Sequence, residues 1–74
     1  MKTLDTLKPG ENAVITGING QNTSLRRRLL DMGLTLNTNV SLVREAPFGD
    51  PIELEVRGYS LTIRKSDAQL IEVK

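Results

Sequence analysis

Three consecutive arginines, Arg26, Arg27 and Arg28, followed by Leu-Leu-Asp-Met-Gly, form the densest group of charged side chains in this 74-residue chain. Guanidinium groups bind phosphates and carboxylates through paired N–H donors. The run could therefore grip a nucleic acid, contact a partner protein, or form only the solvated side of a helix. A phosphate-gripping surface needs several cations on one face, so the choice depends on the element that carries them.

Catalytic side chains are scarce. The chain has no His and no Cys, which removes the usual nucleophile and base pairs, the proton shuttles that work near neutral pH and the commonest transition-metal ligands. Glu53 and Glu55 are the one pair of carboxylates spaced for the same face of an expected strand, and such exposed carboxylates usually serve solubility. We therefore expect no enzymatic activity, no cofactor and no metal site.

Charge and length narrow the function further. Ten Lys and Arg stand against nine Asp and Glu, interspersed along the chain, for a net charge of +1. This balance predicts no bulk attraction to nucleic acid or membrane. The length suits one domain over residues 1–74. No apolar run reaches the roughly 18 to 20 residues of a membrane helix, and residues 1–11 lack a signal-peptide core, so we expect a soluble, cytoplasmic product.

Apolar residues alternate with polar ones in several short runs, which is typical of half-buried antiparallel strands. Strands are expected at residues 12–16, 39–42, 52–57, 59–64 and 70–73. Arg57-Gly58 is short enough for a tight hairpin, whereas residues 46–51 (APFGDP) need a longer turn. Residues 66–69 can form one short helical turn.

The expected fold is mainly β: a small antiparallel barrel of about five strands with one inserted α-helix at about residues 24–32. Closure into a barrel would remove most of the free edges that so short a sheet exposes. Asn22, Thr23 or Ser24 can cap the start of the helix, and Gly33 stands where a left-handed residue ends it. The helix then covers one end of the barrel.

On a helix of this register, the arginines fan apart instead of converging. Arg27 and Arg28 point away from the apolar arc and can pair weakly with Asp31, three or four residues on. Arg26 falls inside the arc, so its charge must either reach over the rim of the barrel or meet a carboxylate of this chain or a partner. The arc consists of Leu25, Leu29, Leu30 and Met32.

The turn at residues 46–51 carries the one phenylalanine, Phe48. A large aromatic residue at such a turn usually folds back over the open end of a small barrel, and this is the favoured interpretation. The alternative is contact with a partner, because an exposed rigid aromatic residue is an effective interface anchor.

Three stretches resemble the FeoA family, small cytosolic accessory proteins of bacterial ferrous iron uptake: LKPGENAVITGI, RRRLLDMGL and VREAPFGDPIELEVRGYSLTIRKSDAQLIEV. The resemblance covers nearly the whole chain and is most specific over residues 43–73. It implies an SH3-like barrel with a helical insertion. It also implies action with FeoB, the membrane iron transporter that has a cytosolic GTP-binding domain. Similar domains make protein contacts at the C-terminus of DtxR-type iron-dependent repressors.

The chain departs from the family pattern G-(L/I)-x-P-G after the helix, where it has Leu36 and Asn37. Asn tolerates left-handed backbone better than other non-glycine residues, so we expect Asn37 to keep the turn and Leu36 to loosen it. Metal binding, attached to the family by analogy with the repressors, is not expected without imidazole; the remaining donors are scattered carboxylates and Met32.

The leading hypothesis is a non-enzymatic module that binds and regulates, or helps to assemble, a FeoB-type transporter through its GTPase region. The expected partner contacts are Leu25, Arg26, Leu30 and Phe48, and Arg26 is the candidate if an arginine enters the GTPase site. One alternative is a small barrel that binds nucleic acid, if the cations gather on one surface after folding. Another is weak self-association through an edge strand or the helix. The sequence does not indicate whether the module activates or inhibits the GTPase.

Overall fold

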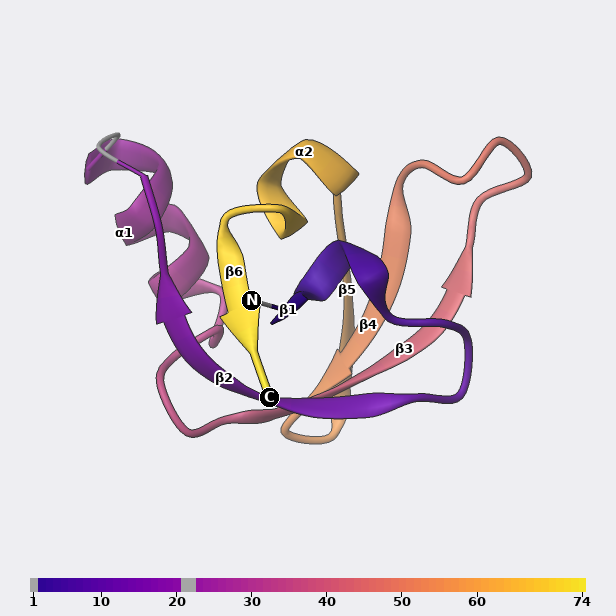
Figure 1. The fold of residues 1–74 in the computed structure, drawn as a ribbon, viewed down its shortest axis with the longest axis horizontal. Helices are drawn as coiled ribbons and strands as arrows, with labels where there is room; N and C mark the ends of the chain where they lie inside the picture. Colours follow the sequence, from indigo (N-terminus) through magenta and orange to yellow (C-terminus); the bar gives the residue numbers. More distant parts are fainter. Residues whose placement is uncertain (1, 21–22) are drawn as a thin grey trace.

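One curved antiparallel sheet carries most of the chain (Figure 1). The computed structural model describes residues 2–20 and 23–74, with Thr23 described by its backbone alone, so the candidate helix cap Asn22 lies outside the described residues. The elements in chain order are β1 (Lys2–Thr3), the 3-10 helix η1 (Leu4–Thr6), β2 (Asn12–Ile18), α1 (Thr23–Asp31), β3 (Asn39–Glu45), β4 (Ile52–Val56), β5 (Tyr59–Ile63), α2 (Lys65–Ala68) and β6 (Ile71–Val73).

The sheet order is β1-β6-β2-β3-β4-β5, with every neighbouring pair antiparallel. The predicted mainly β fold with one inserted helix is confirmed. The described chain has six strands where the sequence predicted about five, because the two residues of β1 are too few to show any alternation. α2, which follows β5, packs against η1, which follows β1, so these two short helices join the two ends of the sheet.

The core is aliphatic, and alternation places it correctly in β4, where Ile52 and Leu54 are buried while Glu53 and Glu55 face outward. β2 is longer than predicted and reaches Ile18, a buried residue paired with Ile71. The pairing of β2 with β6 shifts register between Ile15 and Gly17. Such a bulge breaks the two-residue period, which is why the alternation in the sequence ended too early.

Gly33 ends α1, as the sequence predicted. Its φ angle is 96°, in the region that favours glycine. The Gly33 N–H donates to the Leu30 carbonyl at 3.0 Å, and the Leu34 N–H donates to the Leu29 carbonyl at 3.1 Å. These two bonds form a Schellman motif, which satisfies carbonyls that the last helical turn would leave unpaired.

The chain returns from α1 to β3 through residues 32–38, here named the return segment, and this segment bonds to β2. The Asn37 N–H donates to the Ile15 carbonyl at 2.8 Å, and the Ile15 N–H donates to the Thr38 carbonyl at 2.9 Å. Asn37 has a φ angle of 66°, so it adopts the left-handed backbone expected from the sequence. The hydrogen bonds set the point at which β3 begins.

The β4–β5 hairpin holds the same segment from the other side. Arg57 and Gly58 form its two-residue turn, with φ angles of 52° and 87°, which confirms the predicted tight hairpin. The Tyr59 hydroxyl donates to the Met32 carbonyl. The Arg57 guanidinium donates to the hydroxyls of Thr35, at 3.1 Å, and Thr38, at 3.3 Å. The return segment is therefore fastened to both β2 and the hairpin.

We expect Gly33→Ala to destabilise the fold more than Gly58→Ala. Both substitutions place a Cβ on a residue with positive φ, which costs on the order of 1 kcal/mol or more. At Gly33 the new Cβ would also collide with the Tyr59 hydroxyl, whereas at Gly58 no heavy atom lies within 4 Å. Urea unfolding should show an additional loss of about 1 kcal/mol or more at Gly33, reduced in a Tyr59→Phe background. Equal losses at the two glycines would contradict this account.

Candidate partner-binding surface

α1 buries a narrower face than the sequence predicted. Leu29 is 1% exposed, and Leu25 and Met32 are half-buried against the core. Leu30, which was expected inside the buried arc, is 40% exposed, so that expectation was wrong. Leu30 is turned by about 100° from Leu29 around the helix, which takes it beyond the face that the sheet covers.

Leu30 instead lies between two arginines. With Arg26, Arg27 and Ser24 it lines a surface depression of about 390 Å³. The spacing explains this, because residues three and four positions apart are neighbours on a helix surface. Among the described residues, no carboxylate forms an ion pair with either Arg26 or Arg27. We name this group, Ser24, Arg26, Arg27 and Leu30, the α1 surface.

Arg28 points in another direction. Its Nη2 atom lies 3.8 Å from Oδ2 of Asp67 in α2. An ion pair this long and this exposed adds little stability. The sequence had suggested that Asp31 pairs with Arg27 or Arg28, but no such ion pair occurs within the described part of the chain. Arg28 lines a different depression from Arg26 and Arg27, so the three arginines do not form one cluster, although Arg26 and Arg27 share the α1 surface.

Phe48 does not fold back over the barrel. Its side chain is 97% exposed, so the favoured interpretation was wrong. The turn is held by the Ala46 N–H, which donates to the Pro51 carbonyl at 3.0 Å, and by Asp50, whose Oδ1 accepts the Lys65 N–H at 2.9 Å. The first bond closes the turn and the second ties it to the start of α2, while Phe48 lies at its outward tip.

The structure brings together only part of the predicted contact set. α1 and the turn between β3 and β4 lie at opposite ends of the longest axis in Figure 1, along which the molecule extends 30 Å. Arg26 and Leu30 share the α1 surface, Leu25 packs half-buried against the core, and Phe48 belongs to a separate region. Phe48 is therefore not a neighbour of the α1 surface.

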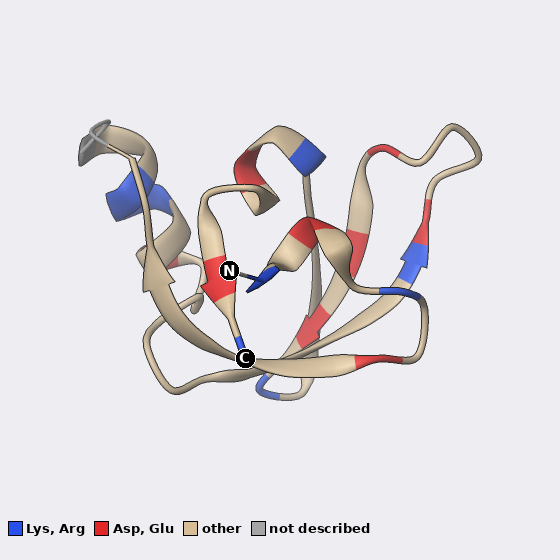
Figure 2. Ribbon diagram, viewed as in Figure 1, with Lys and Arg blue, Asp and Glu red and all other residues tan. Residues whose placement is uncertain are grey.

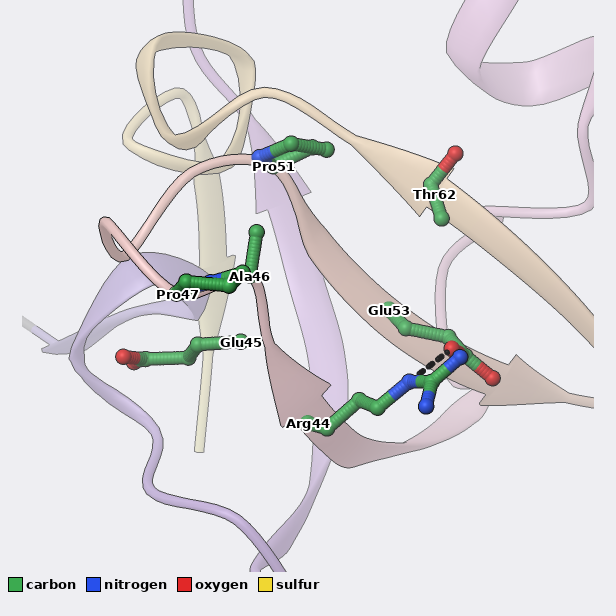
Figure 3. Close-up of a pocket in the computed structure, with 7 residues that line it drawn as sticks. All are labelled: Arg44, Glu45, Ala46, Pro47, Pro51, Glu53 and Thr62. Atoms are coloured by element: carbon green, nitrogen blue, oxygen red, sulfur yellow. Dashed lines mark hydrogen bonds and ion pairs between the residues drawn. The ribbon is translucent and has the colours of Figure 1, made fainter.

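A second depression, of about 480 Å³, lies beside the turn that carries Phe48 (Figure 3). Inside it the Arg44 Nε–H donates to Oε1 of Glu53 at 2.7 Å, so its central charges are already paired. It is lined by Arg44, Glu45, Ala46, Pro47, Pro51, Glu53 and Thr62. It does not adjoin the α1 surface.

Three other apolar residues, Leu36, Val43 and Tyr59, are exposed, and the sequence did not predict them as partner contacts. Val43 lies at a register shift between Leu42 and Arg44, which turns it outward, and no sequence signal marks such a bulge. Tyr59 is half exposed, and its hydroxyl donates to the Met32 carbonyl at the end of α1. The sequence signal that could have indicated this contact is the position of Tyr59 directly after the tight Arg57-Gly58 turn.

Charge is separated in space although it is mixed along the sequence. α1 carries the three arginines and one carboxylate, whereas residues 39–56 carry four carboxylates and one arginine (Figure 2). The net charge of +1 therefore conceals a basic end and an acidic region. The other cations are dispersed: Arg44 pairs with Glu53, Arg57 binds threonine hydroxyls, and Lys65 lies 3.7 Å from Glu45.

Within residues 2–20 and 23–74, no three acidic side chains are grouped as a metal ion would require. No helix among these residues has the length and apolar character needed to cross a membrane. The α1 surface presents two guanidinium groups and an exposed leucine to solvent.

A family model described as the FeoA domain matches residues 2–74. The chain belongs to the FeoA family. This family is linked to ferrous iron transport, as the names of its relatives state. The resemblance noted in the three sequence stretches is thereby confirmed.

Two relatives show how the domain occurs in other proteins. An Fe(2+) transport protein A/Fe(2+) transporter FeoB fusion protein of Porphyromonas gingivalis is 34% identical over 71 residues, which cover 96% of this chain and 8% of that protein. A putative Fe(2+) transport protein A of Campylobacter jejuni is 31% identical over 96% of this chain and 95% of its own length. The chain thus corresponds to a small part of the fusion protein and to nearly all of the second relative.

Solved structures confirm the SH3-like fold. The FeoA protein of Chlorobium tepidum has a TM-score of 0.88 at 39% identity, covering 97% of this chain and 68% of that one. FeoA of Stenotrophomonas maltophilia, described as an SH3 domain protein and solved with zinc, has a TM-score of 0.87 at 26% identity, covering 100% and 91%. A manganese-dependent transcriptional repressor shares the fold, with a TM-score of 0.90 at 18% identity over 99% of this chain and 35% of its own.

We expect Leu30→Gln and Phe48→Ser to change the free energy of unfolding by no more than about 0.5 kcal/mol, because both side chains are exposed. The control Leu29→Ala removes a buried side chain from the same helix and should cost about 2–5 kcal/mol. Urea denaturation of the three variants measures these differences. A loss above about 1 kcal/mol at Leu30 or Phe48 would show that the residue supports the fold.

Proposed function

We propose that this FeoA domain is a non-enzymatic interaction module of the cytoplasm. It binds a FeoB-type ferrous iron transporter at its cytosolic GTP-binding region, and so regulates the transporter or helps to assemble it. The observation that carries this proposal is the α1 surface, where an exposed leucine lies between two arginines that have no carboxylate partner among the described residues.

The α1 surface has the composition of an interface centre. Binding energy at protein interfaces concentrates in a few residues, among which arginine is enriched. Leu30 supplies apolar area that the core does not use, and Arg26 and Arg27 supply donors for carboxylates on either side of it. A partner that buries Leu30 would also desolvate both guanidinium groups, so it must present acidic residues.

The fusion protein of Porphyromonas gingivalis supports FeoB as that partner. Its name joins an Fe(2+) transport protein A with an Fe(2+) transporter FeoB in one polypeptide, and this chain is 34% identical to a segment of it. Covalent linkage raises the effective concentration of one unit near the other. Fusion is most useful when the two units act together, which favours direct contact between the separate proteins.

Phe48 fits a second contact, separate from the first. It lies on a braced turn at the far end of the molecule from α1, so it can contact an element of the partner other than the one that binds the α1 surface. We assign Phe48 to a different part of the transporter. The two ends then make the module suited to linking two elements.

Isothermal titration calorimetry of the protein into the cytosolic GTP-binding domain of its cognate transporter tests the proposal, with and without a GTP analogue. We expect saturable binding in at least one nucleotide state, weakened about tenfold or more by Arg26→Glu and by Leu30→Gln, in line with the loss of about 1.4 kcal/mol or more from an interface anchor. Affinity should also fall as salt concentration rises.

Arg44→Ala is the matched control, because it removes an exposed arginine that pairs with Glu53 away from α1. Its affinity should equal that of the wild-type protein. Equal losses at Arg26 and Arg44 would indicate a general charge effect and contradict a specific α1 surface. Absence of heat in every nucleotide state would contradict docking on the GTP-binding region.

A further inference from the structure

The sheet has an open edge at β5. β5 is the last strand in the sheet order and pairs only with β4 among the described strands. The opposite end, β1, is only two residues long. Edge strands are usually protected by lysine, proline, a bulge or a covering element. β5, with the sequence Tyr-Ser-Leu-Thr-Ile, contains neither lysine nor proline, and its register with β4 runs without a shift.

The pairing shows which backbone groups face outward. The two-residue turn makes Val56 and Tyr59 the hydrogen-bonded pair that closes the hairpin. Hydrogen-bonded and non-bonded pairs alternate along an antiparallel ladder, so the N–H and C=O groups of Ser60 and Thr62 point away from β4. Both residues are exposed, and no described group bonds to these donors and acceptors. β5 therefore offers the unpaired N–H and C=O groups of Ser60 and Thr62 to another strand.

A groove lies beside this edge of the sheet, between α1, β5 and α2. Its volume is about 460 Å³, and it is lined by Arg28, Leu29, Met32, Thr62, Ile63, Arg64, Ser66 and Asp67. Thr62 also lines the depression in Figure 3, on the same sheet face as Glu53, its cross-strand partner. Thr62 thus separates the groove from the depression. An added strand would lie along this edge of β5.

The charges of the groove select its occupant. Arg28 and Arg64 are exposed, while the one carboxylate of the lining, Asp67, lies 3.8 Å from Arg28. The excess positive charge favours an acidic segment. The β5 strand of a second copy, Tyr-Ser-Leu-Thr-Ile, carries no carboxylate, so an acidic segment complements the groove better than a second copy of this chain does.

We propose that the β5 edge binds an extended acidic segment of a partner protein by strand addition. The backbone groups of Ser60 and Thr62 supply the ladder hydrogen bonds, and Arg28 and Arg64 bind carboxylates of the added strand. This site is distinct from the α1 surface, and it does not depend on the identity of the transporter as a partner.

Nuclear magnetic resonance of the ¹⁵N-labelled protein tests the proposal with an eight-residue peptide of alternating Thr and Glu, blocked at both ends. The matched controls are the same peptide with Lys for Glu, and the acidic peptide with central prolines. We expect saturable shifts and slower hydrogen exchange at the amides of Ser60 and Thr62 with the acidic peptide. Both controls should bind at least about tenfold more weakly.

Variants locate the site. Thr62→Pro removes an outward N–H without removing a bond to β4, and it should weaken the acidic peptide about tenfold or more, whereas Thr62→Val keeps the backbone donor and should bind as the wild-type protein does. Dispersed amide signals in both variants establish that they fold. Arg64→Glu should weaken binding as strongly as Thr62→Pro.

Three results would overturn the proposal. The first is that the acidic peptide shifts neither Ser60 nor Thr62, and the second is that the lysine peptide binds as well as the acidic one. The third is a change at these amides that follows protein concentration without any peptide, which would assign the edge to a second copy of the chain.

Discussion

The return of the chain from α1 into β3 is the constraint on which the rest of the structure depends. Two strands that pair in the sheet, β2 and β3, are separated by an inserted helix, so the chain must leave the sheet and re-enter it in register. Tyr59 fixes the end of the helix, Arg57 holds the two threonines of the return segment, and Asn37 bonds to Ile15 of β2. A helix that ended elsewhere would misplace both Leu29 in the core and the start of β3.

This fastening also decides what the helix presents to solvent. With Leu29 directed into the core, Leu30 must point outward between Arg26 and Arg27. The same bonds that complete the fold therefore create the α1 surface, and no separate element is needed to position it.

Sequence patterns predicted the elements that are determined by interactions between residues close together in the chain. Alternation identified β4 and β5, and the residue types at Gly33 and Asn37 identified the left-handed turns. The bulge in β2 and the two-residue β1 left no periodic signal. A helix register gives the direction of Leu30 but not how much of the helix the sheet covers. The exposure of Phe48 depends on Asp50 bonding to Lys65, a contact across fifteen residues that only the folded chain shows.

Hydrogen–deuterium exchange of the protein, alone and in complex with the cytosolic GTP-binding domain of a FeoB-type transporter, tests most directly whether α1 is the docking element. The account predicts that amide exchange slows most in residues 23–31, because partner contacts on Arg26, Arg27 and Leu30 oppose local opening of the helix. Unchanged exchange in α1, with protection confined to residues 39–56, would contradict it.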